Sequence, residues 1–217
     1  MEHLSLKESA YRIIKEKLLN LEYEPGSRIR EDLLAQEISM SRTPVREAIN
    51  QLSAEGFVNN IPRKGVFAIE LTPEEIGDLL DIREPLEMLA IEKCIKKISE
   101  EHISALENNI KEFEAALLAE DFKTCNVLDS KFHLEITAVS NNKKLIEFIK
   151  EIEDFMQIAR GIEKKTNPKM KNELTLQEHK NILEAIKNRD VEAAKEAIKI
   201  NIRTMKANLG LLSSGQE

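Results

Sequence analysis

Residues 41–57 limit what this chain can fold into more than any other segment. Ser41 can cap a helix by accepting hydrogen bonds from its unpaired backbone N–H groups, and Pro44 falls in the first turn, where its missing N–H costs nothing. The apolar residues that follow recur at helical spacing and form one stripe: Val45, Ile49 and Leu52. The segment therefore predicts an amphipathic helix with a defined start.

Three polar side chains lie off this stripe, near the N-terminal end of the predicted helix: Arg42, Thr43 and Arg46. In a helix-turn-helix, this end enters the major groove of DNA, where guanidinium groups bond guanine or phosphate. An ordinary surface helix with two solvated arginines is the alternative, because short motifs also occur by chance. The flanking segments favour the DNA-binding interpretation.

The flanking sequence fits a helix-turn-helix with a β-wing. Upstream, residues 31–38 predict a short helix that a two-residue link joins to the next one. A Pro-Gly turn ends a first helix over roughly residues 7–21. Downstream, residues 57–69 predict two short apolar strands joined by a basic turn at residues 63–65. Three helices and a two-stranded wing are therefore expected.

This segment resembles the winged helix-turn-helix of the GntR family of bacterial transcription regulators over residues 5–70. The matching phrases include Pro25-Gly26-Ser27-Arg28-Ile29-Arg30-Glu31, Leu34-Ala35, Ser41-Arg42-Thr43-Pro44-Val45-Arg46-Glu47-Ala48, and Arg63-Lys64-Gly65. The resemblance implies that double-stranded DNA is contacted by Arg30, Arg42, Thr43 and Arg46, and at the wing by Lys64 and Gly65. Arg30 is included on this ground alone, because the residue pattern by itself leaves it in a loop.

The net charge of −7 is unusual for a DNA-binding chain until it is divided. Residues 1–70 contain 10 basic and 11 acidic side chains, whereas residues 71–217 contain 22 basic and 28 acidic ones. Residues 39–65 carry four basic and two acidic side chains, so the attraction for DNA is local and the acidic remainder discourages indiscriminate binding. An aromatic content of 4% argues against a stacking platform for single-stranded nucleic acid.

Length and composition are typical of a small intracellular protein. The 217 residues are enough for two domains that each bury a core. The sequence has no apolar N-terminal segment and no long apolar run, so we expect a cytoplasmic protein without a membrane partner. Cys94 and Cys125 are too few for a disulfide scaffold and match no metal motif, so we expect buried thiols.

The sequence changes character at residue 72. Thr72 can cap a helix that has proline at its first position and glutamate three residues after the cap. We therefore expect a DNA-binding domain over residues 1–71 and an all-helical domain over residues 72–217. Helical periodicity predicts a mainly α protein with an antiparallel bundle, its helices near residues 73–98, 100–118, 121–139, 142–164, 172–188 and 190–212. Pro85 should kink or split the first of these helices.

One carboxylate and two imidazoles of this domain form a candidate metal site. Asp129 and His133 stand four residues apart and so share a helix face, and His179 comes from a later helix. Such a set can hold zinc, nickel or manganese in the core of a bundle. A solvated acid beside partly buried histidines is the commoner outcome of this pattern, so the residues alone leave both interpretations open.

The second domain resembles the effector domain of the FadR-like, fatty-acid-response branch of the GntR family, called the FCD domain, and the resemblance implies that it binds the effector and forms the dimer. The matching phrases are Arg83-Glu84-Pro85-Leu86-Glu87, Asp129-Ser130-Lys131-Phe132-His133, Ser140-Asn141-Asn142 and Glu178-His179. Many members bind one divalent metal ion per chain with one Asp and three His. Asp129, His133 and His179 fall on three ligand positions, and Asn201 stands at the fourth. Because an amide oxygen is a weaker ligand than imidazole, the site can be metal-free, weakly metallated or shifted toward a harder ion.

The resemblance also implies a small carboxylate as the effector, and no organic cofactor. A carboxylate inside a helical cavity needs a cation or a metal to balance its charge. Arg83 is the best candidate on motif grounds, and Asn201 is expected beside the same site. Arg160 and Arg203 are further possibilities that could equally lie on the surface.

We therefore expect a ligand-responsive transcription regulator, a repressor rather than an activator, that binds a short palindromic operator as a homodimer. A metal-dependent enzyme with an appended DNA-binding head is the alternative, in which the Asp and His residues would activate water. No general base and no nucleophile motif accompanies them, which argues against the enzyme. A third interpretation, an architectural DNA binder that senses nothing, predicts a bundle without a polar cavity.

Overall fold

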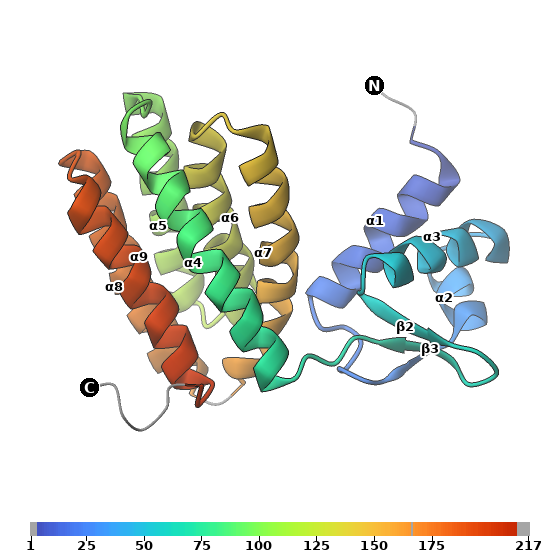
Figure 1. The fold of residues 1–217 in the computed structure, drawn as a ribbon. Helices are drawn as coiled ribbons and strands as arrows, with labels where there is room; N and C mark the ends of the chain where they lie inside the picture. Colours follow the sequence, from blue (N-terminus) through green and yellow to red (C-terminus); the bar gives the residue numbers. More distant parts are fainter. Residues whose placement is uncertain (1–3, 166, 212–217) are drawn as a thin grey trace. The chain divides into compact units, whose positions relative to one another are not determined.

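The computed structural model describes residues 4–165 and 167–211, which belong to two compact units (Figure 1). One unit extends to Leu71, and the other begins at Thr72. Within the described residues, no helix has an apolar stretch long enough to cross a membrane.

The first unit, as far as it is described, contains three helices and three strands. The helices are α1 (Leu6–Leu19), α2 (Glu31–Glu37) and α3 (Arg42–Ala54), and the strands are β1 (Arg28–Ile29), β2 (Val58–Ile61) and β3 (Gly65–Ala68). Both α1 and α2 pack against α3. The helix that carries the basic motif is therefore supported by the other two helices.

Helix α3 is held in place by the predicted apolar stripe. Val45, Ile49 and Leu52 are all fully buried, and burial of one such side chain contributes roughly 1.5–3 kcal/mol. Ser41 occupies the N-cap position with an extended backbone, but its side chain makes no capping hydrogen bond, contrary to the prediction. The start of α3 is instead fixed by packing, because Pro44 in its first turn is also buried.

The wing belongs to a three-stranded sheet, whereas the sequence predicted two strands. Strand β3 is central and pairs antiparallel with β2 on one side and with β1 on the other. In the second pairing Arg28 lies opposite Phe67, and Ile29 lies opposite Val66. A strand of two residues is too short to produce a periodic pattern, so β1 could not be detected from the sequence. Ile29 is buried and anchors it.

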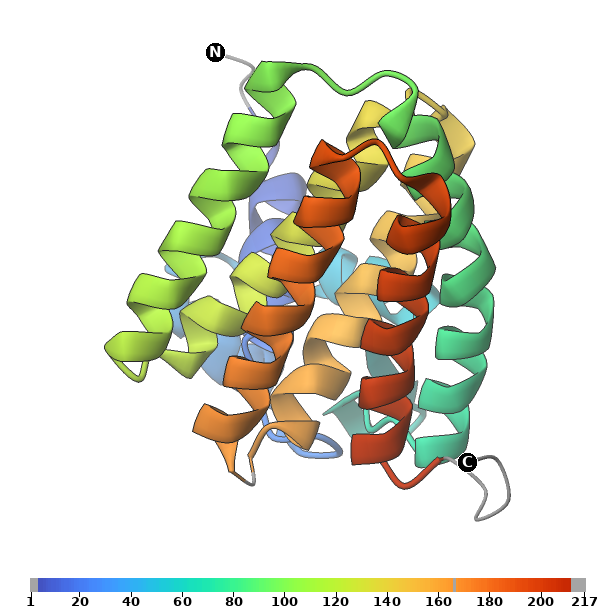
Figure 2. The ribbon, with the colours of Figure 1, turned by 90° about the vertical axis from the view of Figure 1, so that its left-hand side faces the viewer.

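The second unit is a helical bundle, which confirms the predicted mainly α architecture. Its helices are α4 (Pro73–Ile95), α5 (Glu100–Leu118), α6 (Phe122–Val139), α7 (Lys143–Glu163), α8 (Pro168–Lys187) and α9 (Val191–Asn208). Helix α4 packs against α6, α7 and α9, and α5 packs against α6 and α8 (Figure 2). Helix α8 begins at Pro168, earlier than the predicted residue 172, because proline suits the first helical position.

Helix α4 is not split at Pro85, contrary to one of the two predicted outcomes. It runs without interruption through this proline. The proline removes the hydrogen bond to the carbonyl of Asp81. Both residues are exposed, so water can satisfy this carbonyl, while the opposite face of α4 stays packed in the bundle.

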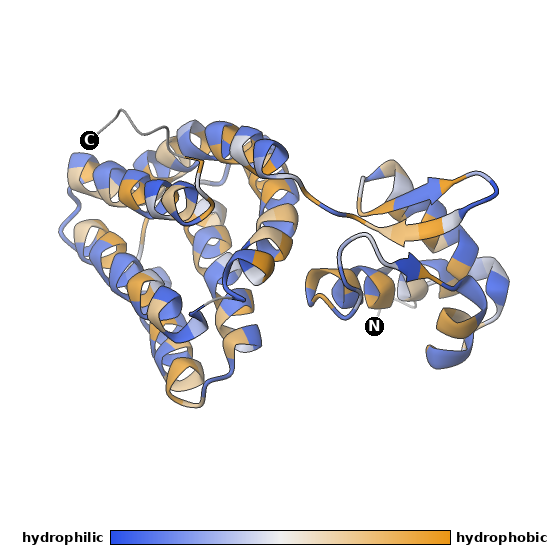
Figure 3. Cartoon of the chain, turned by 90° about the horizontal axis from the view of Figure 1, so that it is seen from below, coloured by the Kyte–Doolittle hydropathy of each residue, from blue (hydrophilic) through white to orange (hydrophobic). Residues whose placement is uncertain are grey.

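The helices of the bundle bury apolar faces, but they also bury charge. Figure 3 shows hydrophobic and hydrophilic residues alternating around each helix, and the buried apolar side chains include Leu80, Ile91, Phe113, Phe132 and Ile182. A second set of buried side chains is charged or polar and includes Arg83, Glu87, Asp129, His133, Glu153, Arg160, Lys164 and His179. Burial of charge is costly unless it is paired, so this set is the candidate site of the bundle.

Replacing Thr72 by alanine should destabilise the second unit. The Thr72 hydroxyl accepts a hydrogen bond from the Glu75 N–H, and the Glu75 carboxylate accepts one from the Thr72 N–H. We expect the free energy of unfolding to fall by about 1 kcal/mol, the usual effect of losing a cap, measured by urea denaturation. Ser104→Ala, at an exposed position within α5, is the control. Equal losses in both variants would contradict a stabilising role for the capping box.

Candidate functional site

Four arginines line an open hollow on the first unit. Its volume is about 610 Å³, and its lining includes Arg28, Arg30, Arg42 and Arg46 together with Glu31, Asp32 and Gly65. The arginines come from β1, from the start of α2 and from the first turns of α3. The fold thus collects basic side chains from three segments at one hollow, which suits an anionic ligand such as a phosphate backbone.

The predicted contact residues are all accessible or partly accessible. Arg42, Thr43 and Arg46 are exposed on α3, Lys64 is exposed in the β2–β3 turn, and Gly65 is partly exposed at the start of β3. Arg30 is also exposed, at the N-cap of α2.

Two of these arginines are paired with carboxylates on α2. Arg46 lies 3.2 Å from Glu31, and Arg30 lies 2.8 Å from Asp32. The side chains of Arg46 and Arg30 are 65% and 60% exposed, so these ion pairs contribute little to stability and can exchange for phosphate.

Arg28 is a candidate that sequence reasoning missed. It lies on β1, the strand that left no periodic signal, and its side chain packs against Gly65 of the neighbouring β3. A Cβ atom at Gly65 would lie 3.0 Å from Arg28 Nε, and the φ of Gly65 is +115°. The φ requires glycine at this position, because L-residues rarely adopt such a value. Gly65 thus allows the Arg28 guanidinium to lie beside the strand.

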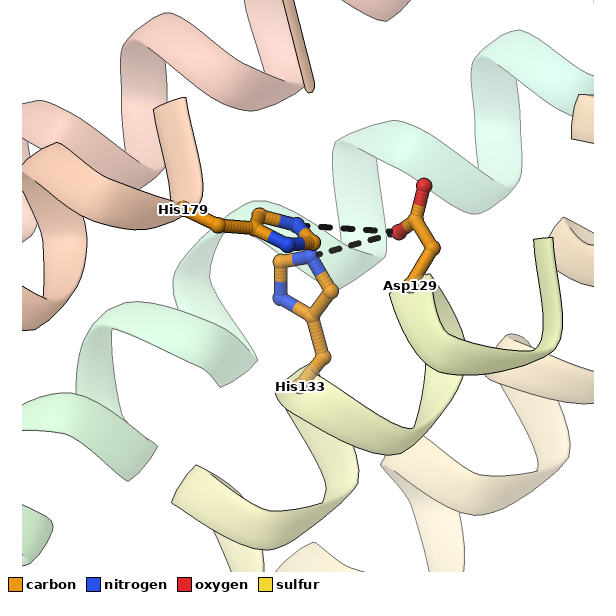
Figure 4. A group of neighbouring side chains, drawn as sticks. All are labelled: Asp129, His133 and His179. Atoms are coloured by element: carbon orange, nitrogen blue, oxygen red, sulfur yellow. Dashed lines mark ion pairs between the residues drawn. The ribbon is translucent and has the colours of Figure 1, made fainter. Parts of the chain in front are cut away.

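The second unit brings together the three predicted metal-ligand side chains. Asp129 and His133 lie one turn apart on α6, and His179 reaches them from α8 (Figure 4). The Nε2 atoms of His133 and His179 are 3.7 Å and 3.9 Å from Asp129 Oδ1. One ligand atom from each residue lies within 4.8 Å of the others, and all three residues are buried.

The imidazoles have free nitrogens where a metal ion would need them. His133 Nε2 and both nitrogens of His179 are buried without a hydrogen-bond partner. His133 Nδ1 lies 2.8 Å from Glu87 Oε2, so this carboxylate can accept the Nδ1 proton and leave the Nε2 lone pair toward Asp129. His179 stacks on Phe132, with ring centroids 4.2 Å apart. Orphaned buried nitrogens are otherwise costly, so the donor set fits a divalent metal.

Charge states in the cluster also suit a metal. Burial lowers the pKa of His179 to about 3, against a smaller opposing effect of Asp129, so the imidazole is neutral. Burial by itself would raise the pKa of Asp129. The nearby positive charges, chiefly those of Arg160 and Lys164, together have a larger opposite effect and hold this pKa far below its usual range. For Glu87, Arg83 and His133 outweigh burial in the same way and lower the pKa to about 2. Neutral imidazole and ionised carboxylate are the forms that coordinate metal.

Buried cations surround this cluster, and the sequence pointed to only some of them. Lys164 Nζ lies 3.1 Å from Asp129 Oδ2, and Arg160 Nε lies 3.5 Å from the same oxygen. Glu153 joins the arginines, because it lies 2.9 Å from Arg160 and 2.8 Å from Arg83. Arg83 also pairs with Glu87 one turn along α4. The pattern of α7 gave no reason to place its charged residues inward, so Glu153 and Lys164 were missed.

Asn201, the residue at the expected fourth ligand position, bonds elsewhere. Its amide nitrogen donates to Glu178 Oε2 at 2.7 Å, and Thr204 donates to the other oxygen of the same carboxylate. Asn201, Arg83 and Asp129 all line a cavity of about 30 Å³. This small cavity has room for a few water molecules or an ion, and it is much smaller than the pockets that usually enclose an organic ligand.

The structure also shows which of the other predicted residues of the second unit are buried. Arg160 is buried, whereas Arg203 is exposed on α9. Cys94 and Cys125 are buried free thiols, as predicted. Burial raises their pKa values to about 12 and about 11, so both remain protonated and poor metal ligands at neutral pH.

Comparison with known families decides the class of this protein. The family model described as bacterial regulatory proteins, gntR family, matches residues 6–68, and the FCD domain model matches residues 78–204. The chain belongs to the GntR family. This GntR protein is a ligand-responsive, DNA-binding transcription regulator and not an enzyme, as predicted.

Individual relatives agree with this assignment. YdhC, an HTH-type transcriptional regulator of Bacillus subtilis, is 32% identical over 190 residues, which cover 87% of this GntR chain and 84% of YdhC. The gluconate operon transcriptional repressor of Bacillus licheniformis is 26% identical over 77% of this chain and 70% of its own length. The solved structure of McbR/YncC from E. coli shares the fold, with a TM-score of 0.86 at 22% identity over 96% of this chain and 98% of that one.

The buried neutral His179 should make the metal-free regulator sensitive to mild acid. In the unfolded chain this histidine takes up a proton below about pH 6.5, whereas in the folded chain it stays neutral until about pH 3. Protons therefore favour the unfolded chain, and stability should fall by about 2 kcal/mol between pH 7 and pH 5 because of this residue. Urea denaturation in chelator at both pH values measures the loss.

A substitution isolates the contribution of this histidine. His179→Gln cannot be protonated, so its stability should depend less steeply on pH between 7 and 5. His102→Gln, which changes an exposed histidine on α5, is the control and should keep the wild-type dependence. If the stability of His179→Gln depends on pH as steeply as that of the wild type, the acid sensitivity does not come from His179.

Proposed function

We propose that this GntR regulator is a cytoplasmic repressor that binds a short palindromic operator as a homodimer and is controlled by a small carboxylate. Family membership carries the DNA-binding and ligand-responsive parts of this statement. The repressor assignment is supported by the gluconate operon repressor among the relatives. The hollow lined by four arginines is the observation on which the DNA interface rests.

The DNA interface is proposed to consist of the hollow and the wing. Its residues are Arg28, Arg30, Arg42, Thr43, Arg46, Lys64 and Gly65. The exposed start of α3 suits base edges in the major groove, whereas the wing and β1 suit backbone phosphate. Glu31 and Asp32, which hold two of the arginines, must release them when phosphate binds. This exchange disfavours weak, indiscriminate binding.

Substitution of the α3 arginines tests this interface. In the double variant Arg42→Ala, Arg46→Ala, operator affinity should fall about a hundredfold, because each arginine contributes roughly 1–3 kcal/mol to base or phosphate contact. The operator is first selected from genomic fragments, and affinity is then measured by fluorescence anisotropy at several salt concentrations. The slope of affinity against salt should become shallower, since fewer phosphates are neutralised.

A matched variant controls for the loss of charge. Lys7→Ala, Arg12→Ala removes two exposed cations from α1, outside the arginine-lined hollow. It should retain wild-type affinity to within a few-fold. Unchanged operator binding by the folded α3 variant would disprove the interface. Equal losses of affinity in both variants would mean that the effect is one of net charge and not of the proposed contacts.

Dimerisation is supported by apolar side chains that α4 and α7 leave exposed. Ile82 and Leu89 lie two turns apart on one face of α4, and Phe148 lies on α7, which packs beside α4. Their side chains are each at least 41% exposed. Exposed apolar groups on adjacent helices suit a self-complementary dimer interface, and two identical heads suit a palindromic operator.

The effector site is proposed to hold one divalent ion per chain on Asp129, His133 and His179. Zinc, nickel and manganese are compatible with these ligands. A bound ion would give a carboxylate effector a cation to bind, and Arg83 and Asn201 line the same cavity. Because the cavity is small, the effector must separate α9 from its neighbours, and this movement would favour one conformation of the regulator.

Native mass spectrometry tests assembly and metal binding together. Protein purified without chelator, before and after addition of Zn²⁺, Ni²⁺ or Mn²⁺, should be a dimer with one ion per chain. Asp129→Asn and His133→Gln should lose the ion, whereas Asp78→Asn, which changes an exposed residue of α4, should keep it. A monomer would contradict the proposed dimer. A dimer that stays metal-free would contradict the metal site.

A further inference from the structure

Lys164 has an unusual position for a lysine. It follows the last residue of α7 and turns its ammonium group into the bundle, where the side chain is only 9% exposed. The Nζ atom lies 3.1 Å from Asp129 Oδ2 on α6 and 3.2 Å from Asn172 Oδ1 on α8. Asn172 is itself fully buried and is fixed by donating to the Pro168 carbonyl. Two other helices thus hold the ammonium beside a proposed metal ligand.

The buried ionic side chains around Asp129 already balance in charge. Within the described residues, the cations of this network are Arg83, Arg160 and Lys164, and its carboxylates are Glu87, Asp129 and Glu153. Glu163 forms a separate pair with Lys171, at 2.6 Å. Glu178 is only partly buried and is bonded by Asn201 and Thr204. Three cations therefore match three carboxylates without any metal.

A divalent ion on the cluster would upset this balance. It would approach Asp129 Oδ1, the oxygen that faces both imidazoles, while Lys164 bonds the other oxygen of the same carboxylate. The ion would add two positive charges, and the further carboxylates that line the cavity among the described residues are Glu163, already paired with Lys171, and the partly buried Glu178. Charges of the same sign repel strongly in a buried site, because little water screens them.

We propose that Lys164 is a built-in counter-ion of Asp129, which competes electrostatically with a divalent metal and sets the metal affinity of this chain. The inference rests on the metal site proposed above. Lys164 supplies in the metal-free protein the charge that a metal supplies in the loaded one. Its removal leaves the network one negative charge in excess, which favours the ion.

A supporting role for Lys164 in metal binding would predict the opposite sign. If the lysine served mainly to orient Asp129, its loss would weaken the site, as the loss of groups that orient metal ligands usually does. Arg160 Nε lies 3.5 Å from the same Oδ2 atom, so Asp129 keeps a cationic neighbour without Lys164. The dominant effect of removing Lys164 is therefore the loss of a competing charge.

Metal titration of the full-length protein separates these alternatives. Chelator-treated wild type, Lys164→Gln and Lys164→Met are titrated with Zn²⁺ and with Ni²⁺ by isothermal calorimetry, and their metal-free melting temperatures are recorded. Both variants should bind metal about ten- to a hundredfold more tightly, the range over which groups around the ligands alter affinity. Their metal-free melting temperatures should fall, because Asp129 has lost a partner.

Two further variants serve as controls. Lys165→Gln makes the same change in net charge at the adjacent, exposed residue and should bind metal as the wild type does. Lys164→Arg keeps the charge and should also remain close to wild type. If Lys164→Met does not fold, Lys164→Gln decides, because its side chain retains hydrogen-bonding groups.

The outcomes distinguish this inference from the proposed function beneath it. Tighter metal binding by Lys164→Gln and Lys164→Met than by the wild type and the two controls supports the competition. Equal or weaker binding by these variants overturns it and leaves the metal site in place. If neither the wild type nor any variant binds metal, both the proposed metal site and the proposed competition are wrong.

Discussion

The buried carboxylate of Asp129 is the constraint on which the second unit depends. A carboxylate inside a helical bundle is tolerated only when its charge is balanced. Arg160 and Lys164 balance it directly, and Glu153 ties Arg160 to Arg83 on α4. The same carboxylate faces both imidazoles of the cluster. Asp129 is therefore both the carboxylate that the buried cations balance and the group that the proposed metal ion would contact, so metal binding there would act on the packing of α4, α6, α7 and α8.

The two units use pairs of carboxylate and cation in opposite ways. Glu31 holds Arg46 in the first unit at an exposed position, where water weakens the pair and a phosphate can replace the carboxylate. Glu153 holds Arg83 and Arg160 in a buried position, where breaking a pair would leave an uncompensated charge. Burial thus decides which arginines are available to a partner. The arginines of α3 are available, whereas Arg83, although it lines the small cavity, is already engaged.

Much of the architecture could be predicted because it depends on local periodicity. The apolar stripe of α3 and the approximate positions of the bundle helices follow from a spacing that any helix imposes. Two local predictions differ from the structure: Ser41 makes no side-chain cap, and β1 adds a third strand. Of the two outcomes predicted at Pro85, the split of α4 does not occur. Packing and strand pairing decided these points, and a local pattern records neither. Arg28 was missed as a candidate DNA contact for the same reason, because a strand of two residues carries no local signal that it pairs with β3.

Spacing along the chain and a family resemblance were enough to specify a winged helix-turn-helix, a helical effector domain and the residues of a candidate metal cluster. They could place Asp129 and His133 on one helix face, because one turn of helix separates them. Spacing alone could not say that His179 would meet this pair, which only the resemblance implied. Neither could say that Asn201 would bond Glu178, or that Lys164 would point inward from the end of α7. Those outcomes depend on which helix faces converge. Convergence is decided by the packing of segments far apart in the sequence, and no local pattern records it.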